Sequence, residues 1–237
     1  MLPYQLIRSV KRKTVGLQVK HGKIIIRAPK YVSEQDIAHI VKSKSIWLQR
    51  KIAEQNAQPA AKNDYYQQDS QLLINGERKT LDIHYGLFPD VTFDQDIIIV
   101  TLSDKLKTKI AADIKQQDKY VKQQLQAWLK QQTQLYIDQN LCHYAEKIGV
   151  LPKSFNVRLY KSRWGSCNSR KELSFSSLLA MTPKWIIDYV IVHELCHLRH
   201  MNHSADFWQL VALHYPNYLL AKTWLKSYQS QLQWPTI

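Results

Sequence analysis

The chain has 237 residues, of which 45% are apolar, so it can bury the core of one large domain or of two modest ones. Its longest apolar runs, such as residues 185–192, are too short to cross a bilayer, and no membrane-spanning helix is predicted. Lys and Arg (33) outnumber Asp and Glu (19). The formal charge of +14 would attract nucleic acid, nucleotides or acidic proteins, or would belong to a plain solvated surface.

The first residues and the cysteines indicate a cellular location. The opening sequence MLPYQLIRSVKRK lacks the apolar segment and the cleavage site of a signal peptide. Cys142, Cys167 and Cys196 form no C-x-x-C pair, so we expect free thiols and neither a disulfide framework nor a zinc ribbon. These features predict a cytoplasmic protein.

The first part of the chain is predicted to be rich in strands. Three short strands are expected over residues 4–10, 14–19 and 23–29, with a turn at His21 and Gly22. Ser33 is a typical helix N-cap, and apolar residues at helical spacing extend that helix to about residue 57. The basic run at Arg8, Lys11, Arg12 and Lys13 is either a phosphate-binding face or a set of side chains that point into water.

Three further strands complete this predicted β-rich region. A polar loop is expected over residues 58–70. Residues 71–86 predict a hairpin that turns at Asn75 and Gly76, and residues 96–102 predict one more strand. We therefore place the boundary of a β-rich N-terminal region with one helix after residue 102.

Residues 103–237 are predicted to form the second domain. A Lys- and Gln-rich segment with an apolar stripe predicts one long helix over residues 103–148, ended by Gly149. Strands are expected over residues 154–160 and 172–180, and the edge of the second one could pair with an extended peptide. Thr182 is expected to cap the next helix, with Pro183 at its first position.

That last helix carries the sequence HELCH, from His193 to His197. On a helix, residues i and i+4 lie on one face, so both imidazoles can converge on one metal ion. Glu194 follows the first ligand, where its carboxylate can reach a water molecule next to the metal. The pattern arises by chance in about one such chain in a hundred, so the sequence favours a metal site.

A third ligand must come from beyond the helix, and two histidines are available. On an unbroken helix His200 would lie about 10.5 Å along the axis from His193, too far for three rings to meet one ion. His203 can reach only if the chain reverses, for which Asn202 offers a left-handed residue and Ser204 a new helix cap. We predict His203. Three protein ligands leave a fourth position open, as in catalytic zinc sites.

Other side chains near the motif are candidates for contact with substrate. Arg163 lies in the sequence KSRWGSC and could hold a carboxylate or a phosphate, or could pair with an acid such as Asp188. His214 and Tyr215 follow the metal motif and could stabilise an oxyanion, or could simply pack in the core.

Two stretches resemble a known family. RWGSCNSR (Arg163–Arg170), and the segment from Pro183 that runs into IDYVIVHELCHLRHMNHSADFW, are similar to the YgjP-like metallopeptidase domain family, relatives of the SprT and WLM peptidases. The resemblance implies an α+β fold with a minimal zincin-like C-terminal domain. It also implies His193, His197 and His203 as Zn²⁺ ligands and Glu194 as the base.

The chain departs from that family pattern at one place. Ser176 and Ser177 stand where family members commonly have an Asn-Trp pair, so Ser176 is a candidate substrate contact.

The leading prediction is a zinc-dependent peptidase acting on a polypeptide. The alternatives are a metal-dependent nucleoside triphosphate pyrophosphohydrolase and a nucleic-acid-associated protease that acts on DNA-bound proteins. The oligomeric state is not predicted.

Overall fold

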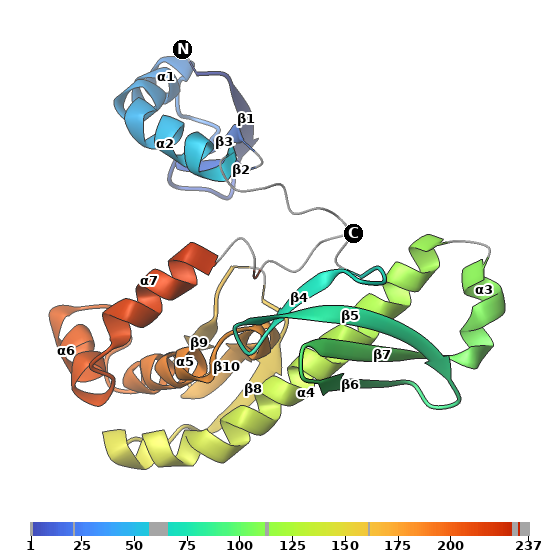
Figure 1. Ribbon diagram of the computed structural model, residues 1–237. Coiled ribbons are helices and arrows are strands. Elements are labelled where there is room, and N and C mark those ends of the chain that lie inside the picture. Colours follow the sequence, from blue (N-terminus) through green and yellow to red (C-terminus); the bar gives the residue numbers. More distant parts are fainter. Residues whose placement is uncertain are drawn as a thin grey trace. The chain divides into compact units, whose positions relative to one another are not determined.

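The computed structural model describes residues 2–20, 22–56, 66–111, 114–160, 162–228 and 232. His21 of the predicted turn and residues 58–65 of the predicted loop lie outside these ranges. The fold is mixed α+β, with helices and three separate sheets (Figure 1). Within the described ranges, no helix combines the length and the apolar character that a membrane span requires.

The chain divides into two compact units, Met1–Lys62 and Asn63–Ile237. This division differs from the predicted boundary after residue 102. The strands between residues 71 and 103 share a hydrophobic core with the long helix that follows them, and this packing joins them to the second unit.

In the first unit a three-stranded sheet packs against two helices. The strands are β1 (Tyr4–Ser9), β2 (Gly16–Lys20) and β3 (Lys23–Pro29), in the order β1-β3-β2. β1 runs parallel to β3 and β2 runs antiparallel to it. Ile24, Ile26 and Ala28 of β3 are buried against apolar residues of the helices, so one face of the sheet forms the core of this unit.

The predicted single helix of this unit is divided in two, which corrects the sequence analysis. The two helices are α1 (Glu34–Ser43) and α2 (Ser45–Asn56). The Ser33 cap is confirmed, because its side chain accepts a hydrogen bond from the backbone N–H of Asp36. Lys44, with φ −104° and ψ 11°, interrupts the helix locally.

The second unit begins with a four-stranded sheet in the order β4-β5-β7-β6. Its strands are β4 (Gln71–Ile74), β5 (Glu77–Gly86), β6 (Asp90–Asp94) and β7 (Ile97–Ser103). The predicted hairpin is confirmed, with positive φ at both Asn75 and Gly76. β6 was not predicted, because its sequence DVTFD lacks a long apolar run.

The tip of the β4–β5 hairpin is joined to the segment before the metal motif. The backbone N–H groups of Asn75 and Gly76 donate to the carbonyls of Ala180 and Met181, at 3.0 and 2.9 Å. A side chain at Gly76 would collide with the ring of Pro183. The first sheet of this unit therefore helps to position the start of the helix that carries HELCH.

The predicted helix over residues 103–148 is interrupted near its start. It consists of a short 3-10 turn η1 (Asp104–Leu106), α3 (Lys107–Ala111) and α4 (Ile114–Ile148). Gly149 ends α4 as predicted, with its N–H bonded to Glu146 and a positive φ. α4 spans two cores, and one end packs on the β4–β7 sheet while the other end packs on the metal-motif helix (Figure 1).

The third sheet has the order β8-β10-β9. Its strands are β8 (Ser154–Arg158), β9 (Gly165–Cys167) and β10 (Glu172–Ser176), and a 3-10 turn, η2 (Ser177–Met181), follows β10. The predicted peptide-binding edge on residues 172–180 is wrong, because β10 is hydrogen-bonded on both sides. The two outer strands are β8 and β9, and β9 was not predicted because it is only three residues long.

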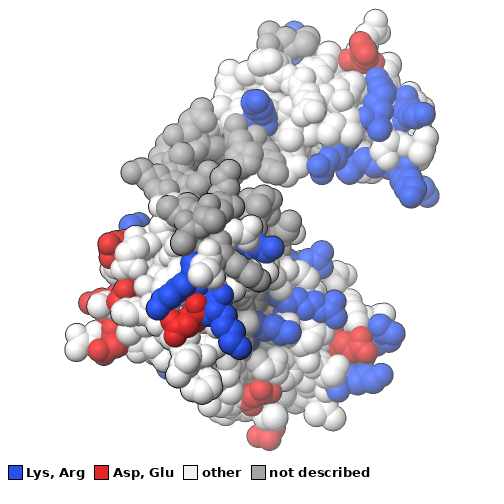
Figure 2. Space-filling view, turned by 90° about the vertical axis from the view of Figure 1, so that its right-hand side faces the viewer, with Lys and Arg blue, Asp and Glu red and all other residues white. Residues whose placement is uncertain are grey.

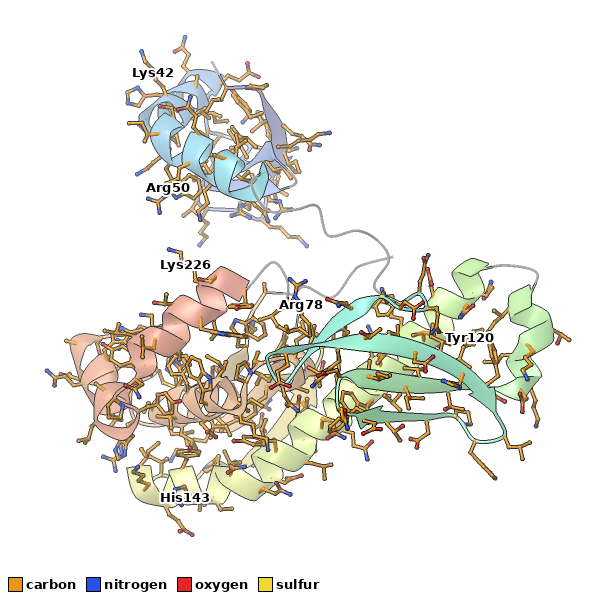
Figure 3. All side chains as sticks on the ribbon, viewed as in Figure 1. Lys42, Arg50, Arg78, Tyr120, His143 and Lys226 are labelled. Atoms are coloured by element: carbon orange, nitrogen blue, oxygen red, sulfur yellow. The ribbon has the colours of Figure 1, made fainter. Side chains whose placement is uncertain are left out.

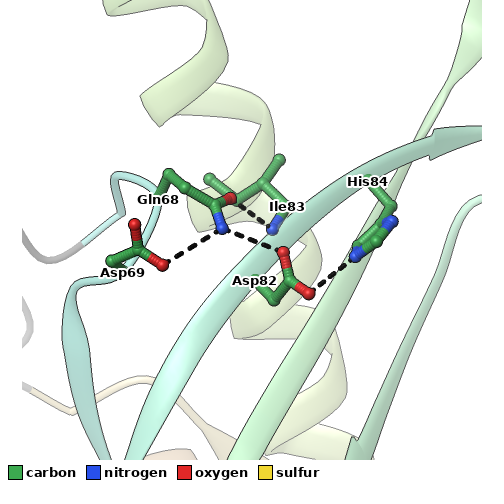
Figure 4. Close-up of polar contacts among 5 residues, drawn as sticks. All are labelled: Gln68, Asp69, Asp82, Ile83 and His84. Atoms are coloured by element: carbon green, nitrogen blue, oxygen red, sulfur yellow. Dashed lines mark hydrogen bonds and ion pairs between the residues drawn. The ribbon is translucent and has the colours of Figure 1, made fainter.

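A polar network closes the exposed edge of β5 beyond the end of β4 (Figure 4). The Gln68 amide donates to Asp82 at 2.9 Å and to Asp69 at 3.3 Å, and its carbonyl accepts the N–H of Ile83 at 2.9 Å. His84 donates to Asp82 at 2.7 Å. The hydrogen bonds from His84 and Gln68 hold the pKa of Asp82 below its ordinary value. Gln68 thus substitutes for a strand partner.

We expect Gln68→Ala to lower the free energy of unfolding by about 1 kcal/mol, because the Ile83 N–H and the Asp82 carboxylate lose their amide partner. Urea denaturation followed by circular dichroism measures this change. Gln67→Ala is the matched control, since the Gln67 contact with Ser70 uses only the backbone carbonyl. Equal stability of the two variants would contradict the role given to the Gln68 side chain.

Candidate metal centre

The metal motif lies on α5 (Lys184–Cys196), a helix packed deep in the second unit. Ile186, Ile187, Val190, Ile191 and Leu195 are all buried in one core with α4 and the β8–β10 sheet. The helix begins one residue later than predicted, with Pro183 as its N-cap. Burial of this core fixes the position of α5 and therefore the position of the side chains at its C-terminal end.

The chain reverses directly after α5. His197 is the C-cap of α5 and retains helical backbone angles, so its side chain lies on the same face as that of His193. Arg199 holds the turn by donating to the carbonyls of Ile148 and Gly149 at 2.8 and 3.2 Å. The turn is thereby attached to the C-terminal end of α4.

Asn202 and Ser204 complete the reversal, though not in the way predicted for Asn202. The φ of Asn202 is not in the left-handed region, and its side-chain oxygen instead accepts the N–H of Ser204 at 3.3 Å. Ser204 caps α6 (Ala205–His214) as predicted, accepting the N–H of Phe207. The two short hydrogen-bonded turns return His203 to the end of α5.

His193, His197 and His203 converge, with their ligand atoms all within 4.8 Å of one another. The Nε2 atoms of His193 and His203 lie 3.2 Å apart. Two ligands at about 2.0–2.1 Å from one tetrahedral ion are about 3.3–3.4 Å apart. His197 has its Nδ1 3.0 Å from the carbonyl of His200, so its Nε2 is free to bind a metal. His200 contributes this carbonyl, and His203 supplies the third imidazole.

Aromatic rings hold these imidazoles in place. Phe207 stacks on His197 with a centroid separation of 4.5 Å, and Trp208 stacks on His203 at 5.6 Å. The Tyr189 hydroxyl lies 3.5 Å from Nδ1 of His193. The His193 ring also packs edge-on against Phe207, with a centroid separation of 5.0 Å, so rings from α6 contact all three histidines.

The surroundings keep two of these histidines neutral. Burial, and then the neighbouring imidazoles, lower the pKa of His193 to about 3. Burial also lowers the pKa of His197. Neutral imidazoles are the form that binds metal, so the site offers donor nitrogens without first having to release protons.

Glu194 is buried beside the three histidines, with only 4% of its surface exposed. Burial raises its pKa to about 8, and the charge of Arg163 opposes this effect. One of its oxygens, Oε2, is buried without a hydrogen-bond partner among the described residues. A buried carboxylate oxygen without a partner is costly, and a water molecule or an ion beside it would remove that cost.

Gly165, the first residue of β9, makes the position of Glu194 possible. A side-chain carbon built on Gly165 would lie 2.5 Å from Oε1 of Glu194 and 2.6 Å from its Cγ. Only a residue without a Cβ lets β9 approach the carboxylate this closely. β9, one of the two outer strands of the third sheet, therefore lies directly against Glu194.

The remaining predicted site residues lie in different settings. Arg163 is exposed, close enough to Glu194 to affect its pKa, and its guanidinium lies over the Tyr160 ring. Ser176 is fully buried and caps η2, so its hydroxyl is not presented to a substrate. The Tyr215 hydroxyl donates to the carbonyl of Trp185 at 2.6 Å. Asp188, the alternative partner of Arg163, accepts a hydrogen bond from Tyr136.

Three neighbours of the site were not found from the sequence. Tyr189 precedes His193 by four residues, so helical spacing alone could have indicated it. The contact of Gly165 with Glu194 joins two distant segments, and nothing in the local sequence predicts it. Lys222 of α7 (Tyr218–Tyr228) lies 3.8 Å above the Trp208 ring and contributes to the lowered pKa of His193.

No curated protein sequence matches the chain. Among solved structures, the metallopeptidase zymogen of Pyrococcus abyssi abylysin is similar at 20% identity with a TM-score of 0.35, over 43% of this chain and 99% of that chain. A family model described as YgjP-like, metallopeptidase domain, matches residues 13–228. Because this match spans most of the sequence, the protein belongs to the YgjP-like metallopeptidase domain family.

Proposed function

We propose that the protein is a zinc-dependent peptidase in which His193, His197 and His203 hold the metal and Glu194 is the general base. The observation that carries the proposal is the convergence of three imidazoles beside a buried carboxylate, one oxygen of which has no partner among the residues that the structure describes. Membership of a metallopeptidase family supports the reaction class. We also propose that the second unit has a zincin-like architecture, since its metal-motif helix lies beside a small sheet.

The donor set fits zinc. Three imidazole nitrogens suit zinc and related transition metals, whereas magnesium and calcium prefer oxygen ligands. The 3.2 Å separation of the His193 and His203 nitrogens is close to that of two ligands on one tetrahedral ion. When bound, zinc supplies a Lewis acid that polarises the scissile carbonyl and lowers the pKa of a water molecule.

Glu194 has the position expected of the proton carrier. Its Oε2 has no hydrogen-bond partner among the described residues. A metal cation held by the three histidines would favour the charged carboxylate and offset the effect of burial on its pKa, so this oxygen could accept the proton of the attacking water molecule. The same oxygen can then deliver this proton to the leaving amine. Phe207 and the rest of the surrounding core exclude bulk water from one side of the site.

A polypeptide substrate fits the sheet beside the site. β9 is an outer strand of its sheet, and Gly165 on this strand contacts Glu194. An extended peptide that pairs with β9 would have its backbone next to the base, and main-chain hydrogen bonds would supply affinity. Arg163, two residues before Gly165, is then the proposed contact for a carboxylate of the substrate.

We expect Glu194→Gln to bind metal as the wild type does and to lose about 10²–10⁴-fold in peptidase rate, because only the proton acceptor is removed. Metal content by plasma mass spectrometry and cleavage of an unfolded polypeptide measure the two effects. Glu146→Gln, at an exposed position on α4, is the control and should remain active. Undiminished cleavage by Glu194→Gln would remove the assigned base.

Pyrophosphate release from nucleoside triphosphates without any peptide cleavage would contradict the peptidase function.

His203→Ala should weaken metal affinity by more than about 100-fold, because loss of even an indirect partner of a metal ligand costs 10–100-fold. His200→Ala should keep the metal, since only the backbone carbonyl of His200 contacts His197. Competition for zinc with a fluorescent chelator measures both affinities. The reverse result, with loss of metal only in His200→Ala, would make His200 the third ligand.

Gly165→Ala should lower the peptidase rate about 100-fold while metal content stays unchanged, because the added methyl group displaces the Glu194 carboxylate. The control is Gly86→Ala on β5, where the added group would meet only the methyl group of Thr101. A fully active Gly165→Ala enzyme would mean that the close approach of β9 does not position Glu194.

A further inference from the structure

The positive charge of the chain is concentrated in the first unit. Residues 1–62 contain 13 of the 33 Lys and Arg residues and only 3 of the 19 Asp and Glu residues, a formal net charge of +10. The second unit, residues 63–237, has 20 basic and 16 acidic residues, a net charge of +4. The peptidase site is thus on the nearly balanced unit, and the small first unit carries most of the excess.

We propose that the outer face of the β1-β3-β2 sheet is a nucleic-acid-binding surface that contacts the phosphate backbone. Strand alternation separates the two faces of this sheet. The inner face carries the buried core residues of β3. The outer face has Lys23 and Arg27 of β3, both exposed, with Gln5 of β1 and Gln18 of β2 at the same level as Ile25.

Arg12 extends this outer face from the loop between β1 and β2. Its Nη2 atom would lie 2.9 Å from a side-chain carbon built on Gly16, so the guanidinium lies across that glycine. Gly16 pairs directly with Arg27 of β3. The sheet therefore places two guanidinium-bearing residues side by side, and a phosphate between them would relieve their repulsion.

The charge on this face has no acidic counterpart in the strands. β1, β2 and β3 contain no Asp or Glu. Glu34 and Asp36 lie in the first turn of α1, where Asp36 is bonded to Ser33. The helical side also carries basic residues, such as Lys42 and Arg50 (Figure 3), but it is mixed in charge. Figure 2 shows basic side chains prevailing on the first unit.

Arg8 belongs to the same basic run in the sequence but has a structural role. Its Nη1 lies within hydrogen-bond distance of the carbonyls of Pro29, Lys30 and Val32, and it thereby holds the connection between β3 and α1. The alternation of β1 directs Arg8 away from the outer face. The binding surface thus consists of Arg12, Lys23 and Arg27 and excludes Arg8.

Nucleic acid fits this surface better than a lipid membrane does. Membrane-surface binding needs apolar or aromatic groups that enter the lipid, and among the described strand residues the outer face has only Ile7 and Ile25 as apolar groups. A flat face with guanidinium, ammonium and amide groups matches repeated phosphates instead. Contacts to phosphates carry no sequence information directly, so binding through this face should be independent of base sequence.

Fluorescence anisotropy tests the proposal, with full-length protein, a labelled 20-base-pair duplex of mixed sequence and added EDTA. EDTA separates the result from the peptidase function, because nucleic-acid binding on the first unit does not require the metal. We expect binding that weakens with increasing NaCl. The triple variant Arg12→Gln, Lys23→Gln, Arg27→Gln should reduce the slope of log K against log salt concentration by about 2–3 and weaken binding at least about tenfold.

Matched variants distinguish this surface from net charge and from misfolding. Arg12→Lys, Lys23→Arg, Arg27→Lys keeps the charge and should keep the slope. Lys105→Gln, Lys119→Gln, Lys130→Gln removes three exposed charges from the second unit and should also keep it. Circular dichroism monitors folding. If the triple variant unfolds, Lys23→Gln alone should reduce the slope by about 0.9.

Several outcomes would overturn the proposal. One is the absence of duplex binding at 50 mM NaCl, and another is an equal loss of slope in the second-unit variant. A third is binding to phosphatidylserine vesicles that depends on Arg12, Lys23 and Arg27, without binding to the duplex. A single-stranded probe of the same length should bind with a smaller slope, because its charge density is lower.

Discussion

The reversal of the chain between α5 and α6 is the constraint on which the candidate metal centre depends. Two histidines on one helix provide only part of a metal site, and the third must return to the same point. Arg199 ties the turn to the end of α4, and the Asn202 and Ser204 side chains bond to the backbone that follows. Phe207 then stacks on His197 at the end of α5, and Trp208 stacks on His203 after the turn. The site is thus built from a turn held at several points.

The same burial that orders the site also places polar groups where water does not solvate them. His193 and His197 are kept neutral, and one oxygen of the buried Glu194 has no hydrogen-bond partner in the described part of the chain. Burial of each of these groups costs free energy that exposure to water would not. The apolar core of the second unit must therefore stabilise the fold enough to keep them buried. Buried polar groups that lower the stability of the fold are common in functional sites.

The two units differ in the use they make of charge. In the second unit, basic and acidic residues are nearly balanced, and individual groups such as Asp82 and Lys79 have local partners. In the first unit the cations of the exposed sheet face have no acidic residue on the same strands. Repulsion among these cations lowers the stability of the first unit. The apolar core formed by β3, α1 and α2 compensates for this loss.

The sequence by itself determined the local elements and the metal motif. Helical spacing indicated His193, Glu194 and His197, turn residues indicated the Asn75-Gly76 hairpin, and cap residues indicated Ser33 and Ser204. These features depend on neighbours a few residues away. The choice of His203 over His200 also followed from helix geometry, and the side chains converge as expected.

Only the tertiary structure decided what long-range packing controls. It placed β10 in the middle of its sheet with β9 at one edge, brought Gly165 against Glu194 and buried Ser176. It also joined the β4–β7 sheet to the second unit through a core shared with α4. A strand of three residues has too short a pattern to predict, and a contact between distant segments leaves no periodic signal, so the sequence could not reveal either.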